Sequence, residues 1–495
     1  MHYYYITMVM ETMQIRLTME LVNELKVLVG WGIYSSPSEA VRDAVRRLVT
    51  GVEAPIKNIP EAKKEEVKKI QEKVEKKVKE QFQKVTGTVD FYPEDMCSKR
   101  AIFRRFMSVA ESYGFKQIEA PAFEYLDLLA KKEGEEIKKQ IFTLEQKGDE
   151  KLGLRFDVTV SATRMFIEKQ KALPKPVKWY YLTRMWRYEK PQQGRLREFY
   201  QYGTELFGSA KPEADAELIS LLIDSFLCLG LSSKDFFVKI NNRKLLEGLL
   251  KDFIEENIVF DVISIIDKKS KITTEEFVNE LKKLGIIDEN INKINEIVEI
   301  KTIEEIKQLK LNELTKQGLD ELESIFNLLK SKKEFLRLDL STARGLAYYT
   351  GIVFEAFDIN EKYRALAGGG RYDKMVEMFG GEPTPATGFG LGYATLSLLL
   401  AEKGLLPKID LSPDYFIVTI GDVKEKAMEI AGKLRAKCKV EIDLMQRNVG
   451  NQFKYANAIG AKKVIVVGPD ELAKGVVKIK DMNSGEEKEV DIEHL

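Results

Sequence analysis

The chain has only two histidines among its 495 residues, His2 and His494, and both stand at its ends. This scarcity excludes a Ser-His-Asp or Cys-His nucleophile and any histidine-rich metal site. The cysteines Cys97, Cys228 and Cys438 are too far apart in sequence to form a ligand pair or a disulfide framework. This usage suits a reducing compartment, and we expect a cytoplasmic protein.

The chain also lacks an excess of charge of either sign and a long hydrophobic run. The chain carries 78 basic and 78 acidic residues, so a nucleic acid would have to be bound by local patches rather than by a global positive charge. There is no signal peptide and no apolar stretch of transmembrane length, and we expect no membrane partner. Because histidine is so scarce, whatever chemistry occurs here must use arginine, glutamate, glutamine, tyrosine, backbone dipoles or bound Mg²⁺.

The first fifty residues have the pattern of a small separate unit. Residues 13–18 alternate apolar and polar side chains, as a half-exposed strand does. Thr18 can N-cap a helix with an apolar face over 21–29, and Ser36-Pro37-Ser38-Glu39 has the form of a capping box before a second helix over 40–49. One strand and two helices cannot bury enough surface alone, so we expect this unit to dimerise.

This order of elements resembles the ribbon-helix-helix family of DNA-binding dimers, in which two strands pair into a ribbon that enters the major groove. The resemblance implies a β-α-α module over residues 1–52, with Gln14, Arg16 and Thr18 facing the bases and the helix start near Ser36 touching phosphate. Two other interpretations stay open for residues 13–50, a dimerisation module and a module that contacts RNA.

The rest of the chain divides by composition. Residues 53–85 are rich in lysine and glutamate with apolar residues at helical spacing, which predicts an exposed, charged helical linker. Strands and helices alternate over residues 86–403, interrupted by a helical insertion at about 241–335 that carries no obvious chemistry. Residues 404–495 contain strand-like runs separated by helical segments, typical of a compact α/β domain.

Residues 344–350, Arg-Gly-Leu-Ala-Tyr-Tyr-Thr, form the most informative segment. They place Arg344, Tyr348 and Tyr349 on a strand-like run. An arginine there can hold a carboxylate or phosphate in a bidentate fork, and a tyrosine hydroxyl can hydrogen-bond a neighbouring polar ligand. Taken alone, the segment fits a buried strand end with a structural arginine equally well.

A second cluster of polar and aromatic residues lies between positions 184 and 205. Arg187 and Glu189 stand on its first strand-like run. With the period of a strand, one face of the second run carries cations, a ring, an amide and a carboxylate in that order: Arg195, Arg197, Phe199, Gln201 and Glu205. Such a series suits a nucleotide, because cations hold phosphates and a ring stacks on the base.

Two further segments add candidate ligands. Asp157 can hold a substrate ammonium group and Thr159 can hydrogen-bond beside it, although a helix N-cap explains the pair equally well. Alternating glycines in 367–373 and 385–392 allow a strand to lie close under a flat ligand. The glycine-rich phosphate loops of dinucleotide-binding and P-loop folds are absent from the sequence, so ATP, if bound, is bound in another way.

Together these segments resemble the histidyl-tRNA synthetase family of class II aminoacyl-tRNA synthetases. The likeness extends over about residues 86–495 and rests on the following runs: 87–95, 184–208, 344–350, 369–373 and 388–396. It implies a multidomain α+β and α/β protein with an antiparallel sheet flanked by helices and an α/β anticodon-binding domain over 404–495. It also implies a homodimer that uses ATP, Mg²⁺, L-histidine and tRNA(His).

The resemblance implies roles for individual residues. Arg344 would bridge the histidine carboxylate and the α-phosphate, acting with Arg187 as a catalytic residue. ATP would be held by Arg187 on the α-phosphate, Glu189 on the adenine edge, Phe199 stacked on adenine, and Arg195 and Arg197 near the phosphates. The histidine pocket would be formed by the following residues: Asp157, Val158, Thr159, Gln201, Glu205, Arg344, Tyr348 and Tyr349.

Three departures from the family pattern are present. The third motif usually ends in Glu-Arg, whereas this chain has Tyr393-Ala394-Thr395, so another cation, Arg195 or Arg364, must replace the arginine. Ala347 stands where aspartate is common, and Asp157 where glutamate is usual. The alternative function is a catalytically weak regulatory paralogue that senses histidine or binds DNA.

Overall fold

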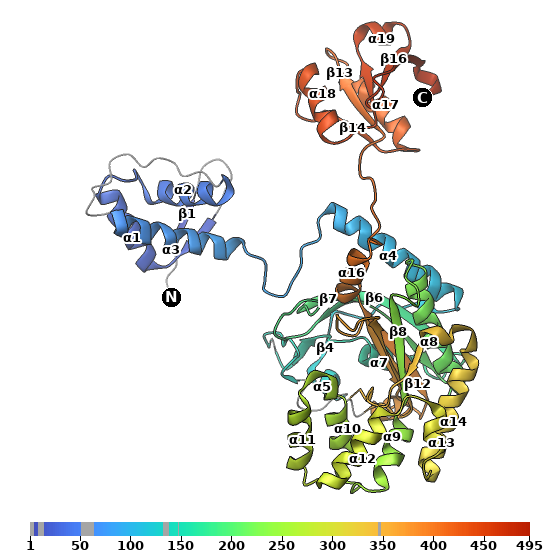
Figure 1. The fold of residues 1–495 in the computed structure, drawn as a ribbon. Coiled ribbons are helices and arrows are strands. Elements are labelled where there is room, and N and C mark those ends of the chain that lie inside the picture. The colour runs from blue at the N-terminus through green and yellow to red at the C-terminus, as the bar shows by residue number, and fades with distance from the viewer. Residues whose placement is uncertain (1–3, 8–13, 51–63, 132–137, 147, 345–347) are drawn as a thin grey trace. The chain divides into compact units, whose positions relative to one another are not determined.

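The computed structural model describes residues 4–7, 14–50, 64–131, 138–146, 148–344 and 348–495 (Figure 1). Two compact units are present, one formed by Met1–Asp90 with Val109–Glu402 and the other by Phe91–Ser108 with Lys403–Leu495. Within the described residues, no helix is both long enough and apolar enough to cross a membrane.

The N-terminal module begins with a hairpin inside one chain. Strand β1 (Tyr4–Thr7) pairs antiparallel with β2 (Gln14–Leu17), and helices α1 (Met19–Gly30) and α2 (Pro37–Thr50) follow. The predicted strand and both helices are therefore present, whereas β1 was not predicted. Gln14 and Arg16 are alternate residues of β2. Thr18 ends the strand and caps α1, because its hydroxyl accepts a hydrogen bond from the Leu21 amide at 3.3 Å.

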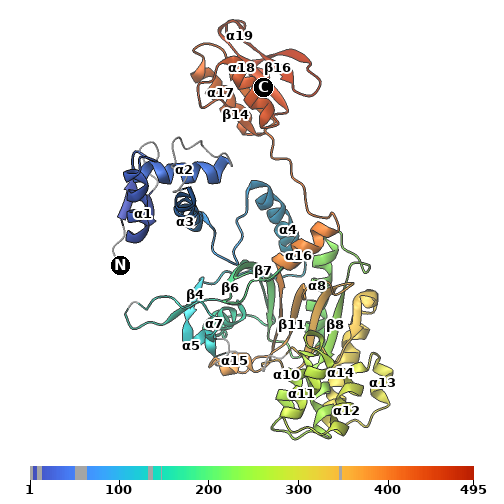
Figure 2. The same ribbon diagram turned by 60° about the vertical axis from the view of Figure 1, so that its left-hand side comes forward.

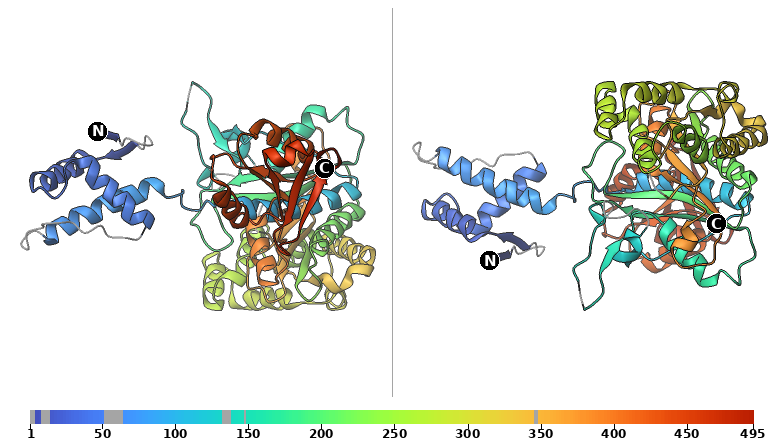
Figure 3. Two further views of the ribbon diagram at one scale, coloured as in Figure 1. Left: turned by 90° about the horizontal axis from the view of Figure 1, so that it is seen from above. Right: turned by 90° about the horizontal axis from the view of Figure 1, so that it is seen from below.

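Helix α3 (Lys64–Phe82) completes the core of this module, which is blue in Figure 3. Its residues Val67, Ile70 and Val74 are buried in one cluster with apolar residues of α1 and α2. The structure differs here from the exposed linker expected over 53–85, of which residues 51–63 lie outside the described part. The apolar stripe of α3 covers the other two helices within the same chain, which removes the physical reason for expecting a dimer.

The rest of the first unit is built on an eight-stranded sheet in the order β3-β6-β7-β12-β11-β10-β8-β9. The six central strands pair antiparallel, and the short edge strands β3 and β9 pair parallel with their neighbours. The strands are β3 (Lys116–Gln117), β6 (Val177–Trp186), β7 (Glu198–Phe207), β8 (Phe236–Asn242), β9 (Leu336–Leu338), β10 (Ile352–Asp358), β11 (Ala367–Arg371) and β12 (Ala386–Gly392). The predicted antiparallel core with flanking helices is confirmed.

Helices cover this sheet. Helix α8 (Pro212–Leu227) contacts β12, and α16 (Tyr393–Glu402) contacts β7 and β12. Helix α7 (Thr159–Lys169) packs with the short α15 (Met375–Met378), and the ring of Phe166 on α7 stacks on that of Phe207 with centroids 4.5 Å apart. These contacts fix the strands whose residues line the site.

A helical insertion lies between β8 and β9 and gathers at one end of the sheet (Figures 1 and 2). It consists of α9 (Arg243–Lys251), α10 (Val259–Ile266), α11 (Thr274–Lys283), α12 (Asp288–Glu299), α13 (Ile303–Lys307) and α14 (Glu313–Leu328). The Asn242 amide and the Lys244 ammonium both donate to the carboxylate of Glu321 on α14, at 2.7 and 2.5 Å. The last helix of the insertion is thus tied to the end of β8.

A small two-stranded sheet leads directly into the segment that contains Asp157, a predicted site residue. Strand β4 (Phe123–Tyr125), after which α5 (Leu126–Ala130) follows, pairs antiparallel with β5 (Leu152–Leu154). The next residue, Arg155, is buried, and its Nε and Nη1 donate to the carbonyls of Arg184 and Pro121 at 3.1 and 2.9 Å. These hydrogen bonds hold the following residues, including Asp157, against β6.

The second unit contains the long helix α4 (Pro93–Ser112) in part, and a five-stranded mixed sheet in the order β14-β13-β15-β16-β17. Its elements are β13 (Tyr415–Thr419), α17 (Lys424–Arg435), β14 (Val440–Ile442), α18 (Val449–Ala458), β15 (Lys463–Val467), α19 (Pro469–Ala473), β16 (Val476–Asp481) and β17 (Glu487–Asp491). The antiparallel strands β16 and β17 were not predicted. Two apolar clusters include α17 and α18 respectively, each packed with strands of this sheet.

Candidate active site

A cavity of about 260 Å³ is lined by residues of the neighbouring strands β6, β7, β12 and β11. Most of the residues predicted for the histidine pocket line it, and so does one residue predicted for ATP. The cavity is lined by these predicted residues: Asp157, Thr159, Arg187, Gln201, Arg344, Tyr348 and Tyr349. They come from four separate segments, so the structure gathers what the sequence shows only as scattered motifs.

The floor of this cavity is made of glycines that are covered by protein side chains. A Cβ atom at Gly368 would meet the Arg344 guanidinium, and one at Gly390 would meet the Gln201 amide. Both contacts would be closer than van der Waals packing allows. The alternating glycines therefore make room for the side chains that line the cavity as well as for a flat ligand.

Arg344 is held in an unusual backbone conformation. Its φ is +42°, a left-handed value that non-glycine residues adopt at a cost of about 1–3 kcal/mol. Its Nη1 pairs with Glu355 Oε1 at 3.1 Å, its guanidinium lies 5.4 Å from the centre of the Tyr349 ring, and its side chain is 19% exposed. Its Nε is buried without a hydrogen-bond acceptor among the described residues, so one donor is left for a ligand. Residues 345–347, which include Ala347, lie outside the described part.

The inner end of the site holds two carboxylates. Asp157 and Glu205 are both buried, and the Tyr372 hydroxyl donates to Glu205 Oε2. Burial raises the pKa of the neighbouring Tyr181 well above its ordinary value, and the charges of Glu205 and Asp157 raise it further. Tyr181 therefore stays a neutral hydrogen-bonding group beside them. Two acceptors at this end suit a ligand that presents N–H groups.

Arg187 joins the cavity to the neighbouring aromatic residue. Its Nε donates to the Phe156 carbonyl at 3.1 Å, and its guanidinium lies 5.1 Å from the centre of the Phe199 ring. Phe199 is half-buried on β7. This arrangement leaves the other nitrogens of Arg187 directed toward a ligand while the ring provides a stacking surface.

The remaining residues of the second cluster lie on a turn rather than on the strand. Strand β7 begins at Glu198, so Arg195 and Arg197 precede it, and the predicted shared strand face includes only the residues from 199 onward. Arg195 pairs with Glu189, and Arg197 Nε donates to the Glu189 carbonyl at 3.0 Å. The sequence period failed here because the amides of Arg195 and Arg197 donate to the carbonyls of Gln192 and Gly87, at 2.9 and 2.7 Å, rather than to β6.

Val158 takes no part in the cavity lining. It is fully buried in the apolar cluster that includes Ala162 and Phe166. Residues that the sequence analysis missed include Gln140, Phe156, Tyr181, Tyr372 and Phe389, which line the cavity. Tyr372 stood in the predicted glycine-rich run, and its neighbourhood could have indicated it. Gln140 lies in a segment without any such pattern.

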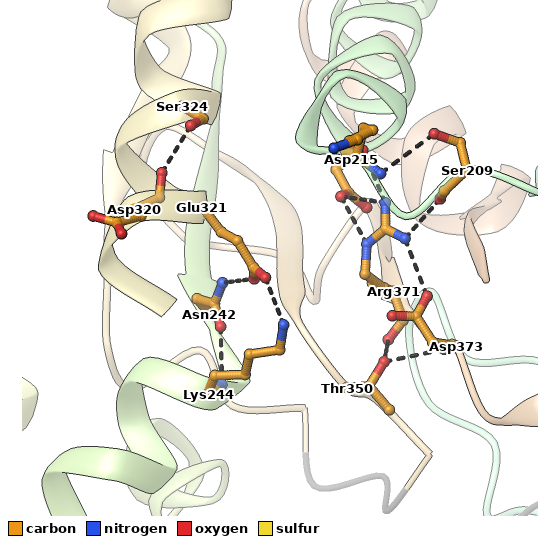
Figure 4. Close-up of polar contacts among 11 residues, drawn as sticks. Ser209, Asp215, Asn242, Lys244, Asp320, Glu321, Ser324, Thr350, Arg371 and Asp373 are labelled. Carbon is orange, nitrogen blue, oxygen red and sulfur yellow. Dashed lines mark hydrogen bonds and ion pairs between the residues drawn. The ribbon is translucent and has the colours of Figure 1, made fainter. Parts of the chain in front are cut away.

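A buried ion pair between Arg371 and Asp215 (Figure 4) is connected by hydrogen bonds to Thr350, in the segment that carries Tyr348 and Tyr349. Arg371 Nε and Nη2 donate to Asp215 Oδ2 on α8 at 2.9 and 2.7 Å, and both side chains are almost fully buried. The carbonyl of Arg371 accepts a hydrogen bond from the Thr350 amide at 2.8 Å, and the Asp373 amide donates to the Thr350 hydroxyl at 3.0 Å. Thr350 directly follows Tyr348 and Tyr349, so the pair fixes where both rings lie.

Comparison with known proteins decides which family has this site. A family model described as histidyl-tRNA synthetase matches residues 87–396, and a model described as an anticodon-binding domain matches residues 414–495. The chain belongs to the histidyl-tRNA synthetase family. The match to the synthetase model begins at residue 87 and leaves the N-terminal module outside it.

Individual members of the family match over most of their length. The histidine–tRNA ligase of Pyrococcus horikoshii is 43% identical, with 84% of this chain and 97% of that protein covered. That of Haloarcula marismortui is 39% identical, with 83% and 95% covered. The crystal structure of histidyl-tRNA synthetase from Nostoc has a TM-score of 0.69 at 28% identity and covers 83% of this chain and 97% of that one.

A fourth relative bears on the alternative function. A structure from Bacillus halodurans, described as an ATP phosphoribosyltransferase regulatory subunit/histidyl-tRNA synthetase, has a TM-score of 0.66 at 26% identity and covers 78% of this chain and 98% of that one. Both catalytic and regulatory descriptions therefore occur among the family members that this chain is similar to. The predicted membership in the family is confirmed.

Among the described residues, no group of three or more histidine, cysteine or acidic side chains is placed to hold a metal ion. Glu189, which contacts two of the predicted phosphate ligands, is already paired with one of them, Arg195. Magnesium that acts in this site therefore fits best as a companion of ATP, because Mg²⁺ keeps several waters and binds through phosphates with few protein ligands.

Proposed function

We propose that the chain is an active histidine–tRNA ligase, whose cavity binds L-histidine and MgATP and forms histidyl-adenylate before transfer to the 3′ end of tRNA(His). The observation that carries the proposal is the convergence of Arg187, Arg344 and Gln201 with Tyr348 and Tyr349 around one cavity in a chain of this family. Membership in the family identifies the reaction, and the cavity supplies residues suited to it.

For ATP, we assign Arg187 to the α-phosphate and Phe199 to the face of adenine. Support comes from the proximity of the two side chains, because the Arg187 guanidinium lies 5.1 Å from the centre of the Phe199 ring. Glu189 would accept from the adenine amino group. Arg195 and Arg197, on the turn beside it, would face the outer phosphates.

For histidine, we assign the imidazole to the carboxylate end of the cavity. Asp157, Glu205 and Gln201 offer oxygen acceptors, Thr159 a hydroxyl, and Tyr348 and Tyr349 the surrounding rings, while Val158 contributes through the core behind them. Buried polar groups would lose their partners with any apolar side chain, and such sites discriminate by factors of about 10⁴ or more. Selection for imidazole follows without an editing step.

The first step joins two substrates at one phosphorus atom. A carboxylate oxygen of histidine attacks the α-phosphorus of ATP, the bond to the bridging oxygen breaks, and pyrophosphate leaves with its charge. Arg344, with its unpaired Nε, would contact both the carboxylate and the α-phosphate and stabilise the charge that gathers between them. Positioning and charge stabilisation are sufficient for this chemistry, so a protein histidine is not needed.

Further partners belong to the same proposal. We assign anticodon recognition in tRNA(His) to the unit that contains residues 414–495, homodimer formation to the catalytic unit, and the cytoplasm as the place of action. For the N-terminal module we propose contact with DNA or RNA through residues 13–50. The alternating Gln14 and Arg16 on the β1–β2 hairpin support it, because a two-stranded ribbon fits the major groove.

The alternative is a regulatory paralogue with weak catalysis, favoured by Tyr393-Ala394-Thr395 in the third motif and by the Bacillus halodurans relative. Against it stands the match of residues 414–495 to an anticodon-binding domain, which a ligase that charges tRNA would use. Charging of tRNA(His) transcript with labelled histidine by the full-length chain separates the two. Charging of at least one tRNA per protein molecule supports the ligase. Binding of histidine without any charging supports the sensor.

A further inference from the structure

The site contains more positive charge around the phosphate region than the assigned residues account for. Arg187 and Arg195 lie close enough that each acts on the other, and a third guanidinium, Arg364, acts on Arg195 as well. Burial lowers the pKa of Arg195, and the charges of Arg364 and Arg187 lower it further. Glu189 is the carboxylate paired with Arg195. One carboxylate does not balance three guanidinium groups, and a polyanion such as a triphosphate would supply the missing negative charge.

Arg364 is placed by a loop that the structure anchors on both sides. This loop, residues 359–366, connects β10 to β11. At its start, the amides of Lys362 and Tyr363 donate to the buried carboxylate of Asp358 at 3.0 and 2.9 Å. At its end, the Leu366 carbonyl accepts from the Gly392 amide at 3.2 Å, where β12 passes into α16. The loop is thus held beside the third motif.

Side chains of the same loop also form hydrogen bonds to α16. Lys362 Nζ and the Tyr363 hydroxyl both donate to Glu402 Oε2 at 2.5 Å. Arg364, the next residue, is exposed and forms no ion pair with any residue that the structure describes. The two preceding residues, Lys362 and Tyr363, are thus already bonded to Glu402, whereas the charge of Arg364 is available to a ligand.

The turn that carries Arg195 meets α16 as well. The Thr395 hydroxyl in the first turn of α16 donates to the Gly194 carbonyl at 3.2 Å. Tyr393, Ala394 and Thr395 supply no cation of their own. The two loops that carry Arg195 and Arg364 are therefore both joined to the beginning of α16, one through Gly194 and one through Leu366.

We propose that Arg364 binds the terminal phosphates of ATP from the β10–β11 loop and, together with Arg195, does the work of a cation that the third motif of this chain lacks. The inference rests on the proposed ligase function, since it names the phosphate contacts of the same site. Arg195 alone is insufficient, because its charge is balanced by Glu189. Arg364 supplies the uncompensated charge that the outer phosphates require.

Equilibrium dialysis of labelled ATP and, separately, of AMP against the full-length chain tests this directly. Arg364→Gln should weaken ATP binding by about tenfold to a hundredfold, the effect of losing a charge-assisted hydrogen bond, and leave AMP binding within twofold. Arg364→Lys should restore part of the loss. Arg337→Gln, at another exposed arginine on the edge strand β9, should change neither and serves as the matched control.

Equal ATP binding by wild type and Arg364→Gln would overturn the inference, and so would an equal loss of ATP and AMP binding, which indicates damage to the adenosine site. Because dialysis needs no turnover, the result is separate from that of the proposed function. The wild-type chain could bind ATP more tightly than AMP, lose this preference in Arg364→Gln and yet form no adenylate. That result would leave the inference about Arg364 standing and refute the ligase proposal.

Discussion

Replacement of Arg344 by alanine removes the side chain on which the proposed mechanism depends most. The guanidinium is largely buried, pairs with Glu355 at 3.1 Å and keeps Nε without an acceptor among the described residues. Loss of a single preorganised donor to a developing charge costs about 10²–10³ in kcat. Arg344 is assigned to two anionic groups at once, so we expect adenylate formation to fall by about 10³ or more.

The same replacement should cost little stability. Breaking a buried ion pair usually costs about 3–5 kcal/mol when a charge is left behind. Burial already raises the pKa of Glu355, and Arg344 is the largest of the cationic contributions that oppose the rise. Without Arg344 the pKa of Glu355 rises further, and because its side chain is 23% exposed, water can solvate the carboxylate that loses its partner. We therefore expect a cost below this range.

A matched variant separates catalysis from backbone strain. Arg344→Gly removes the same guanidinium and also relieves the left-handed φ of +42°, which alanine keeps. Both variants should lose adenylate formation equally, whereas Arg344→Gly should be more stable than Arg344→Ala by about 1 kcal/mol. Single-turnover adenylate formation and urea unfolding measure the two quantities. Near-normal adenylate formation in either variant would refute the mechanism, and equal stability would refute the account of strain.

Three further predictions concern the support of the site. Gly390→Ala should raise KM for histidine about tenfold in pyrophosphate exchange, because the new Cβ displaces the Gln201 amide, while Gly392→Ala, where nothing lies within 4 Å, should leave it unchanged. Asp215→Ala should lower stability by about 3 kcal/mol in urea unfolding at pH 7, the lower end for a broken buried pair, because Arg371 keeps other acceptors. Burial raises the pKa of Asp215 to about 6, so the folded state binds a proton more tightly than the unfolded state between the ordinary 3.8 and about 6. Stability should therefore fall by about 3 kcal/mol through this group as pH rises across that window, at 1.36 kcal/mol per pKa unit. Asp215→Asn should remove that slope, and a slope that persists in this variant would show that another group causes it.

The sequence indicated many of the residues that line the cavity where unusual residue types are concentrated in short runs. Arg344, Tyr348 and Tyr349 were proposed because a cation and two tyrosines suit an anionic or polar ligand, although a structural arginine fits that segment alone equally well. Arg187 and Gln201 were found by their place in a series of cations, ring and amide. Such local patterns persist whatever the surrounding fold, so they can be recognised without knowing which strands are neighbours.

Features that depend on contacts between distant segments were missed. Helix α3 was predicted to be an exposed linker because its apolar stripe is narrow among charged residues, and only the contacts with α1 and α2 show that Val67, Ile70 and Val74 belong to a core. The start of β7 was placed too early because the alternation of side chains begins at Arg195, whereas the strand begins at Glu198. Tyr181 lines the cavity because β6 pairs with β7, and Gln140 is held near it because its carbonyl accepts a hydrogen bond from the Tyr188 amide; no sequence period shows either contact.

Histidine-dependent exchange of labelled pyrophosphate into ATP, measured on the purified full-length chain with each of the other amino acids as a control, tests the central claim most directly. The account predicts exchange with histidine alone, because the acceptors of Asp157, Gln201 and Glu205 are assigned to the N–H groups of imidazole. Exchange with a different amino acid would contradict the assignment of the pocket. No exchange, in a folded protein that still binds histidine, would contradict the enzyme itself and favour the sensor.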